Sequence, residues 1–415
     1  MLAPAELRRV RIANTGLFVL TGLAIALWVV NIPAVQARTG ISNSTLGLLL
    51  LALGAGSIAG MQAAGWISDR WGSRRTAGLS VAVIAVAING PGLATTAWHL
   101  AVILPLLGVG TGAVTVAAND QAVKIQNAYG RPIMSAFHGY FSIAGAAGAG
   151  LGALFHTLDM PTTGALGTAS LSAAAVGALS VPRLLAREDL TEPAPPVPDG
   201  VPEADITTSR EGHTAHAGEP SVLAPAIALA VLAVLLNLAE GTATDWSAVH
   251  AVEHLHRSQS FAALAYGTFA LAMTIGRLTA DRFVARLGPV AVVRGGSLLA
   301  GAGILGVILS PDYPLTLACW LLFGLGLSGI VPQLFTAAGN LSSARRGVIL
   351  SRVVGLGYLG MLAGPAVIGW LSDAVGINTA LLAPLLCCLA GLLLAGAVRP
   401  RTAVPDEAPK VTSTA

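Results

Sequence analysis

Two acidic residues lie within an apolar run at residues 237–250, which reads NLAEGTATDWSAVH. They are Glu240 and Asp245, and a charged group at the centre of a membrane costs about 2.5–3.5 kcal/mol or more. If the run crosses a membrane, both residues need a function, and we expect both to bind a substrate or a proton. Asp245 has a second interpretation, as a structural cap beside Trp246. Gly241 predicts a break next to Glu240, as in membrane helices that are interrupted at a binding site.

A second polar group lies near the end of another apolar run, at residues 99–119. Asn119, Asp120 and Gln121 are consecutive there, and Asp120 is predicted either to join a substrate or proton site or to pair with a basic neighbour such as Lys124. His138, in the next run, could exchange a proton near neutral pH. Alternatively, it is a packing histidine held by a hydrogen bond, and both interpretations stay open.

Single polar or aromatic residues in the apolar runs are further candidates for the same site. Each amide or hydroxyl is alternatively a satisfied helix–helix hydrogen bond, and each tryptophan an interfacial anchor. These candidates are Asn31, Asn237, Trp246, Gln333 and Tyr358.

The composition indicates a membrane protein as the framework for these residues. Of the 415 residues, 54% are hydrophobic and only 10% are charged, whereas soluble domains carry about 25% charged residues. Apolar runs of about 20 residues, long enough to cross the hydrocarbon layer as a helix, recur throughout. The 49 glycines suit membrane helices, where small residues allow backbones to approach closely. We expect an all-α membrane protein.

No cofactor, metal site or nucleic-acid surface is predicted. The net charge of +3 comes from basic residues in short runs between apolar segments, and the three cysteines lie in apolar runs, so no disulfide framework is indicated. His250 and His254 have a zinc-like i, i+4 spacing, but no wider metal-binding pattern surrounds them. No Walker motif is present, so energy must come from a gradient across the membrane.

Twelve membrane spans are predicted, and most connections between them are short. The exception is residues 182–221, rich in Pro, Glu, Asp and Thr, which we expect to form a disordered cytoplasmic linker. It separates an N-terminal six-helix bundle (1–181) from a C-terminal one (222–400), which is followed by a cytoplasmic tail (401–415). The predicted spans are 14–35, 45–67, 76–95, 99–119, 133–156, 164–182, 222–243, 259–279, 289–309, 314–335, 348–371 and 378–398.

The basic residues predict the orientation of these spans. With both termini in the cytoplasm, only Arg38 and Arg257 of the 23 Lys and Arg residues fall on the outer side. Such an imbalance is the positive-inside signal of multi-pass membrane proteins. We expect a monomeric, multi-pass protein of the cell (inner) membrane with both termini cytoplasmic.

One phrase occurs twice, as GWISDRWGSRR (65–75) and GWLSDAVG (369–376). The first copy closes span 2 on the predicted inner side, and the second closes span 11 on the outer side. Related glycine-containing helix ends close span 5 (152–159) and span 8 (276–288), and Arg accompanies only the two inner copies. A three-helix unit used four times with alternating inversion is typical of transporter folds. We therefore predict two pseudo-symmetric bundles of inverted three-helix repeats.

These features resemble the major facilitator superfamily. The signature of this superfamily, in the loop between helices 2 and 3, is Gly-x-x-x-Asp-Arg-x-Gly followed by two basic residues. Residues 65–75 match it, with the final basic pair displaced by one residue. A degenerate copy lies at 276–288. The resemblance implies a secondary transporter and not an enzyme, with this loop as a cytoplasmic gate between the bundles.

In the implied gate, Gly65 would let two helices pack closely, Gly72 would permit the turn, and Asp69 would meet helix 11 near Arg352. Alternatively, the arginines only set the topology. The implied gate residues are Gly65, Asp69, Arg70, Gly72, Arg74, Arg75, Asp281, Arg282 and Arg352.

A narrower resemblance is to the fucose-permease-like branch of the superfamily, which contains sugar–proton symporters. It rests on residues 117–152 and 237–250. Those symporters use membrane carboxylates on helices 1 and 4, whereas helix 1 here has Asn31, and Asp120 lies just beyond Asn119 on helix 4. The branch implies alternating-access symport of a sugar or related polar metabolite with protons.

Two other functions stay open. One is proton-coupled efflux of a drug or metabolite. Drug antiporters of the superfamily carry a Gly-Pro motif on helix 5, whereas here the Gly-Pro is Gly364-Pro365 on helix 11. The other is a membrane solute sensor, although neither the linker nor the tail offers a signalling domain.

Overall fold

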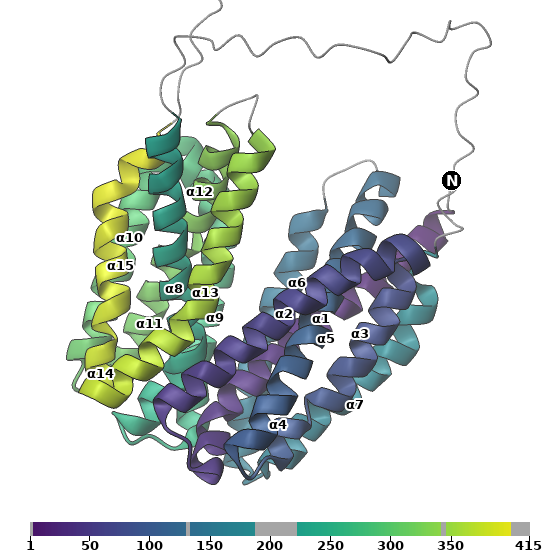
Figure 1. The fold of residues 1–415 in the computed structure, drawn as a ribbon, viewed down its shortest axis with the longest axis horizontal. Helices are drawn as coiled ribbons and strands as arrows, with labels where there is room; N and C mark the ends of the chain where they lie inside the picture. Colours follow the sequence, from purple (N-terminus) through teal and green to yellow (C-terminus); the bar gives the residue numbers. More distant parts are fainter. Residues whose placement is uncertain (1–2, 130–132, 187–221, 342–345, 400–415) are drawn as a thin grey trace, which may run out of the picture.

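The chain forms two bundles of long helices (Figure 1). The computed structural model describes residues 3–129, 133–186, 222–341 and 346–399, and within these ranges no strand occurs, so the predicted all-α fold is confirmed. The first bundle contains α1 (Pro4–Thr39), α2 (Asn43–Trp71), α3 (Ser73–Ala87), α4 (Gly90–Leu93), α5 (Ala97–Tyr129), α6 (Met134–Thr157) and α7 (Thr162–Ser180). The second contains α8 (Leu223–Glu253), α9 (Gln259–Leu287), α10 (Pro289–Leu309), α11 (Tyr313–Ser328), α12 (Ile330–Gly339), α13 (Arg346–Val375), α14 (Ile377–Ala380) and α15 (Leu382–Leu394).

The predicted spans all fall on helices, although several helices are longer than predicted. Eleven helical segments of the described residues are long and apolar enough to cross a membrane, and α6, with 24 residues, occupies the remaining predicted position. Helices α1, α5 and α8 have 36, 33 and 31 residues. Their ends extend beyond the apolar stretch because no helix-breaking residue stops them there. Most of the predicted linker and the whole predicted tail lie outside the described residues.

Two ends of the molecule are distinguished below. The linker end is the one at which α7 stops and α8 begins. The far end is the one at which α1 leads into α2 and α8 stops. In Figure 1 the two bundles converge at the far end and diverge toward the linker end.

Each of the four equivalent helix ends noted in the sequence is followed by a residue with a positive φ. Gly72, Gly288 and Gly376 follow α2, α9 and α13 with φ of 84°, 79° and 81°. Asp159 follows α6, with φ of 51°. Positive φ is readily adopted by glycine and tolerated by aspartate, so the chain reverses direction at the same place in each three-helix unit.

Small residues bring the helices of each bundle into close contact. In the first bundle, Gly56 of α2 lies against the backbone of Pro105 of α5, so that a β-carbon would collide with the carbonyl group. In the second bundle, Gly360 of α13 lies in the same way against Val234 of α8. Glycine permits this approach where no hydrophobic force between helices is available in lipid.

The buried apolar side chains form two clusters. One lies within the second bundle. The other fills the first bundle and extends to Trp246 of α8, Tyr266 of α9 and Ile368 of α13, so the two bundles share part of their core in this conformation.

The bundles touch each other mainly along α2 with α13 and α6 with α9. Near the far end, Gly47 of α2 lies against the backbone of Pro365, and Gly369 lies against the backbone of Asn43. Nearer the linker end, a β-carbon added to Gly65 of α2 or to Gly355 of α13 would meet no described atom within 4 Å. The expectation that Gly65 lets two helices pack closely is therefore wrong for this conformation, because α2 and α13 are apart there.

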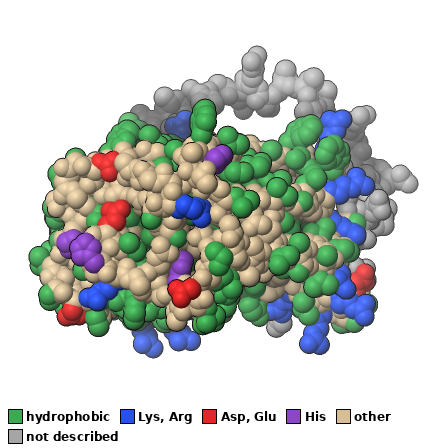
Figure 2. Space-filling model, turned by 90° about the horizontal axis from the view of Figure 1, so that it is seen from below, with side chains coloured by type: hydrophobic (Ala, Val, Ile, Leu, Met, Phe, Trp, Pro, Cys, Tyr) green, Lys and Arg blue, Asp and Glu red, His purple; other side chains and the backbone are tan. Residues whose placement is uncertain are grey.

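The distribution of charge follows the two ends. Figure 2 shows the molecule from the far end, and its Lys and Arg side chains gather most densely at the right-hand edge, on the side where Figure 1 places the linker end of α1. The rest of this face is covered mainly by uncharged atoms, as expected for a surface with few basic loops.

Candidate functional site

A cavity of about 530 Å³ lies between the two bundles. The first bundle lines it with residues of α1, α2, α5 and α6, and the second with residues of α8 and α13. A volume of this size is in the range of small-molecule sites, about 300–1,000 Å³. Because both bundles contribute walls, a change in their relative position would change the cavity.

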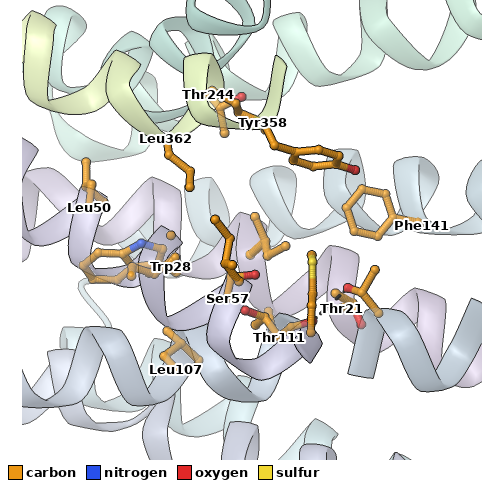
Figure 3. Close-up of a pocket in the computed structure, with 18 of the residues that line it drawn as sticks. Thr21, Trp28, Leu50, Ser57, Leu107, Thr111, Phe141, Thr244, Tyr358 and Leu362 are labelled. Atoms are coloured by element: carbon orange, nitrogen blue, oxygen red, sulfur yellow. Dashed lines mark hydrogen bonds between the residues drawn. The ribbon is translucent and has the colours of Figure 1, made fainter. Parts of the chain in front are cut away.

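The cavity wall is largely apolar, with several aromatic rings. Trp28 and Phe18 come from α1, Phe141 from α6 and Tyr358 from α13. Figure 3 shows the rings of Tyr358 and Phe141 turned toward each other across the boundary between the bundles. His138 of α6 also lines the cavity and meets Phe18 edge-on, with 5.2 Å between ring centres.

Five polar groups of the wall already donate their hydrogen bonds to the backbone of their own helix. The hydroxyl of Thr21 donates to the Leu17 carbonyl at 2.8 Å, and the side-chain amide of Asn119 donates to the Thr115 carbonyl at 2.8 Å. The same holds for the hydroxyls of Thr111, Thr115 and Thr244. A hydroxyl that donates to its own helix still has lone pairs, so what these groups offer to the cavity is mainly the capacity to accept hydrogen bonds.

Asp245 supplies the carboxylate of the cavity. Among the described residues that line the wall, Asp245 is the one acidic residue, and none is Lys or Arg. Within the described part of the chain, the ion pairs involve other residues, and Asp245 has no hydrogen-bond donor to its side chain. An unpaired carboxylate in apolar surroundings is energetically costly. That Asp245 binds a substrate or a proton stays a prediction.

A cluster of hydrogen bonds joins the bundles at the far end. The carboxylate of Asp373, on α13, accepts the backbone N–H groups of Asn43 at 3.0 Å and of Ser44 at 2.9 Å, at the start of α2. The side-chain amide of Asn43 donates to Glu253 of α8 at 2.8 Å and to Ser372 at 2.8 Å. The first N–H groups of a helix lack partners within the helix, so Asp373 caps α2 from the opposite bundle.

This far-end cluster is not among the predicted site residues, although a signal for it is present in the sequence. Asp373 is the aspartate of GWLSDAVG, the second copy of the phrase that contains Asp69. The sequence-based prediction assigns a gate only to the copy with arginines. The structure shows that the copy without arginines makes the contact between bundles in this conformation.

Relatives and solved structures place this chain among known proteins. It is 34% identical to an uncharacterized MFS-type transporter of Yersinia pestis over 92% of this chain and 93% of that protein. The chain belongs to the major facilitator superfamily. The sequence profile of the Major Facilitator Superfamily matches residues 221–414. An uncharacterized transporter of Sinorhizobium fredii is 31% identical, over 86% of this chain and 89% of that protein.

Solved structures share the superfamily fold at low sequence identity. A bacterial homolog of the human lysosomal transporter Spinster has a TM-score of 0.71 at 15% identity, over 97% of this chain and 100% of that one. The nucleoside transporter NupG, as a single-residue variant, has a TM-score of 0.69 at 12% identity, over 93% and 98%. A D-xylose-proton symporter has a TM-score of 0.66 at 13% identity, over 93% and 96%. The chain is a transporter and not an enzyme, whereas membership of the fucose-permease-like branch is not confirmed.

In this superfamily member, Glu240 lies in an ion pair rather than on the cavity wall. Its carboxylate accepts from the guanidinium of Arg277, on α9, at 2.7 Å. Helix α8 also continues through Gly241 without interruption, so the predicted break is wrong. Gly241 lies close to the Met361 carbonyl of α13, which explains the glycine by close helix packing. That Glu240 binds a substrate or a proton stays a prediction.

The three consecutive polar residues of α5 separate in the structure. Asn119 lines the cavity, whereas Asp120 pairs with Lys124 at 2.6 Å, the alternative given for it above. Gln121 is buried on another face, where its amide group donates to Ser73 and to the Leu185 carbonyl. Helical periodicity explains the separation, because successive residues point about 100° apart.

The remaining single candidates divide in the same way. Tyr358 and His138 line the cavity. The amides of Asn31 and Asn237 donate to carbonyls of their own helices at 2.7 Å and do not line the cavity. Gln333 and Trp246 are buried and likewise lie away from its wall.

The predicted gate residues lie at the linker end. Arg352 and Arg282 are exposed, and the guanidinium of Arg70 lies over the Trp66 ring at 5.6 Å. Arg75 is exposed and Arg74 half-buried, while Gly72 forms the expected turn. The side chains of Asp69 and Asp281 lie outside the described residues, so the contact of Asp69 with helix 11 stays a prediction.

Proposed function

We propose that this member of the superfamily is a secondary active transporter that moves a small solute by alternating access, coupled to protons. The observation that carries the proposal is the cavity between two helical bundles that are hydrogen-bonded together at the far end. Rocking of the bundles would break the far-end cluster and bring the linker ends together.

The direction of the bundles in the membrane follows from the basic residues. We propose that the linker end faces the cytoplasm, with both termini there, in the cell membrane. In this orientation the structure corresponds to a state whose outer side is held closed by Asp373, Asn43 and Glu253.

Proton coupling is supported by the titratable groups at the cavity. Asp245 and His138 both line it, from opposite bundles. A proton carried down a potential of 100 mV supplies about 2.3 kcal/mol per charge. A sugar as the solute rests on the branch resemblance alone.

A second candidate function is efflux of an amphipathic compound. The aromatic and aliphatic wall of the cavity favours it, because such a wall binds apolar groups better than polyhydroxylated ones. Export and import use the same cavity, and only the direction of the gradient-coupled step differs.

Transport in proteoliposomes tests the proposal. A panel of sugars and arylalkyl amines is added to liposomes that contain the purified protein and an enclosed pH-sensitive dye. We expect at least one compound to move together with, or in exchange for, protons. Flux of one compound without any proton movement would contradict the coupling, and no flux of any compound in a variety of gradients would contradict the transport function.

A further inference from the structure

Four polar groups of the cavity wall offer it mainly hydrogen-bond acceptors. The donors of Thr21, Thr115, Asn119 and Thr244 are engaged with carbonyls of their own helices. Their oxygen lone pairs remain available to a bound molecule. A ligand that carries N–H or O–H donors matches these four groups, while Ser57, Gln62 and Tyr358 of the same wall can also donate.

The charge of the cavity selects among such ligands. The carboxylate of Asp245 is unpaired in the described part of the chain, and its environment is apolar. On the neighbouring helix α9, Arg277 already pairs with Glu240. The cavity therefore has one carboxyl group without a protein partner, and a cation is the ligand that balances its charged form.

The aromatic residues support the same class of ligand. Trp28, Phe18, Phe141 and Tyr358 contribute rings to the wall. An aromatic ring attracts an organic cation through its negative face and also packs against apolar groups. A small inorganic cation would leave this apolar wall without a partner, whereas an organic cation covers both the rings and the carboxylate.

We infer that the cavity takes an amphipathic organic amine, with its ammonium group on the Asp245 carboxylate and its apolar part against the aromatic wall. The ammonium group donates the hydrogen bonds that the wall can accept and balances the charge of Asp245. Binding of the amine does not depend on the proposed transport function. Only the consequence that the bound amine is the transported solute rests on that function.

Binding to matched amines and alcohols tests the inference directly. The probes are phenethylamine, 4-phenylbutylamine and tryptamine, each paired with the alcohol of the same skeleton, and the full-length protein is held in lipid nanodiscs. Calorimetry at neutral pH is expected to show at least one amine bound at least tenfold more tightly than its alcohol. If every amine binds no more tightly than its alcohol, the inference is overturned.

Variants of Asp245 locate the effect. Asp245→Asn is expected to weaken amine binding at least tenfold and to leave alcohol binding unchanged, whereas Asp245→Glu retains the preference for the amine. Asp159→Asn is the matched control, because Asp159 is an exposed aspartate at the far end. Its φ is 51°, a value that asparagine also tolerates. An amine preference that persists in Asp245→Asn contradicts the inference, provided that the variant elutes as a single folded species.

The outcome separates this inference from the proposed function. If no amine is preferred but the bundles still alternate between two arrangements, the inference fails and the transport proposal stands. If the amine binds through Asp245 but no alternation or flux occurs, the binding site stands and the transport proposal fails.

Discussion

Asp373 at the end of α13 caps the first turn of α2 in the opposite bundle, accepting the Asn43 N–H at 3.0 Å. Its second oxygen accepts the Ser44 N–H at 2.9 Å. A negative group at a helix N-terminus is favourable both as a hydrogen-bond acceptor and through the helix dipole. The contact exists only while the far ends of the bundles are together, so it stabilises one conformation relative to the other.

Removing this cap is expected to shift the balance between conformations. Asp373→Ala removes both acceptors, and because the carboxylate is exposed we expect a change of about 0.5–1 kcal/mol, the lower part of the range for helix caps. The population with an open far end would rise roughly two- to fivefold. The readout is alkylation of Ser57→Cys, on the cavity wall, by a membrane-impermeant reagent added on the far side. An alkylation rate equal to that of the control Asp159→Asn would contradict the role of Asp373.

Glu253 and Asn43 are expected to act as a coupled pair at the same seal. Their side chains meet at 2.8 Å across the boundary between α8 and α2. A hydrogen bond to a charged group contributes about 1.5–3 kcal/mol when buried, and less is expected at this half-buried site. A double-mutant cycle with Asn43→Ala and Glu253→Ala, read out by the same alkylation rates, should give a coupling of about 0.5–1.5 kcal/mol. Additive effects would show that the two residues act independently.

The ion pair of Glu240 and Arg277 is expected to be mainly structural. Arg277→Ala leaves a carboxylate that is only 14% exposed without its partner, and we expect a loss of about 1–3 kcal/mol of stability. The double variant Glu240→Gln with Arg277→Gln removes both charges and should recover much of the stability. Melting temperatures in detergent give the comparison. If the double variant is stable but transports nothing, Glu240 has the binding function that the sequence predicts.

Close packing of α2 and α5 gives a prediction about glycine. A β-carbon at Gly108 would collide with the Leu53 carbonyl, whereas at Gly150 on α6 no described atom lies within 4 Å. Overpacking of this kind costs about 1–3 kcal/mol. We expect Gly108→Ala to lower the melting temperature, while Gly150→Ala leaves it unchanged or raises it slightly, because alanine favours the helix. Equal melting temperatures of the two variants would contradict the packing described.

The sequence predicted the helices and their repeat well, because both depend on local signals. Apolar runs of span length and a glycine such as Gly72 at a turn need no knowledge of distant residues. The site depended on which face of a helix points inward and on the relative position of the bundles. Asp245 and Glu240 are five residues apart, and only packing of α8 against α9 decides that Glu240 meets Arg277 while Asp245 faces the cavity.

The gate illustrates the same limit. Asp69 and Asp373 occupy equivalent positions in the repeated phrase, and either could cap a helix of the opposite bundle. The sequence cannot tell which of the two ends is closed, because it carries the same phrase at both ends. That Asp69 makes its contact in another state of the chain stays a prediction. The basic residues predicted a gate at the linker end, whereas Asp373 contacts the start of α2 at the far end in this conformation.

The central claim, that the bundles alternate about the cavity, is tested most directly by distances between spin labels at both ends. One pair is Ala37→Cys with Ala374→Cys at the far end, and the other is Ala63→Cys with Leu356→Cys toward the linker end, all at exposed positions. Double electron–electron resonance is recorded in nanodiscs for both pairs. Each pair is measured alone, with the added substitution Asp373→Ala, and with the amine of the panel that binds most tightly. The account predicts that the far-end distance lengthens as the linker-end distance shortens, with matching populations. A single unchanged distance for both pairs under all conditions would contradict it.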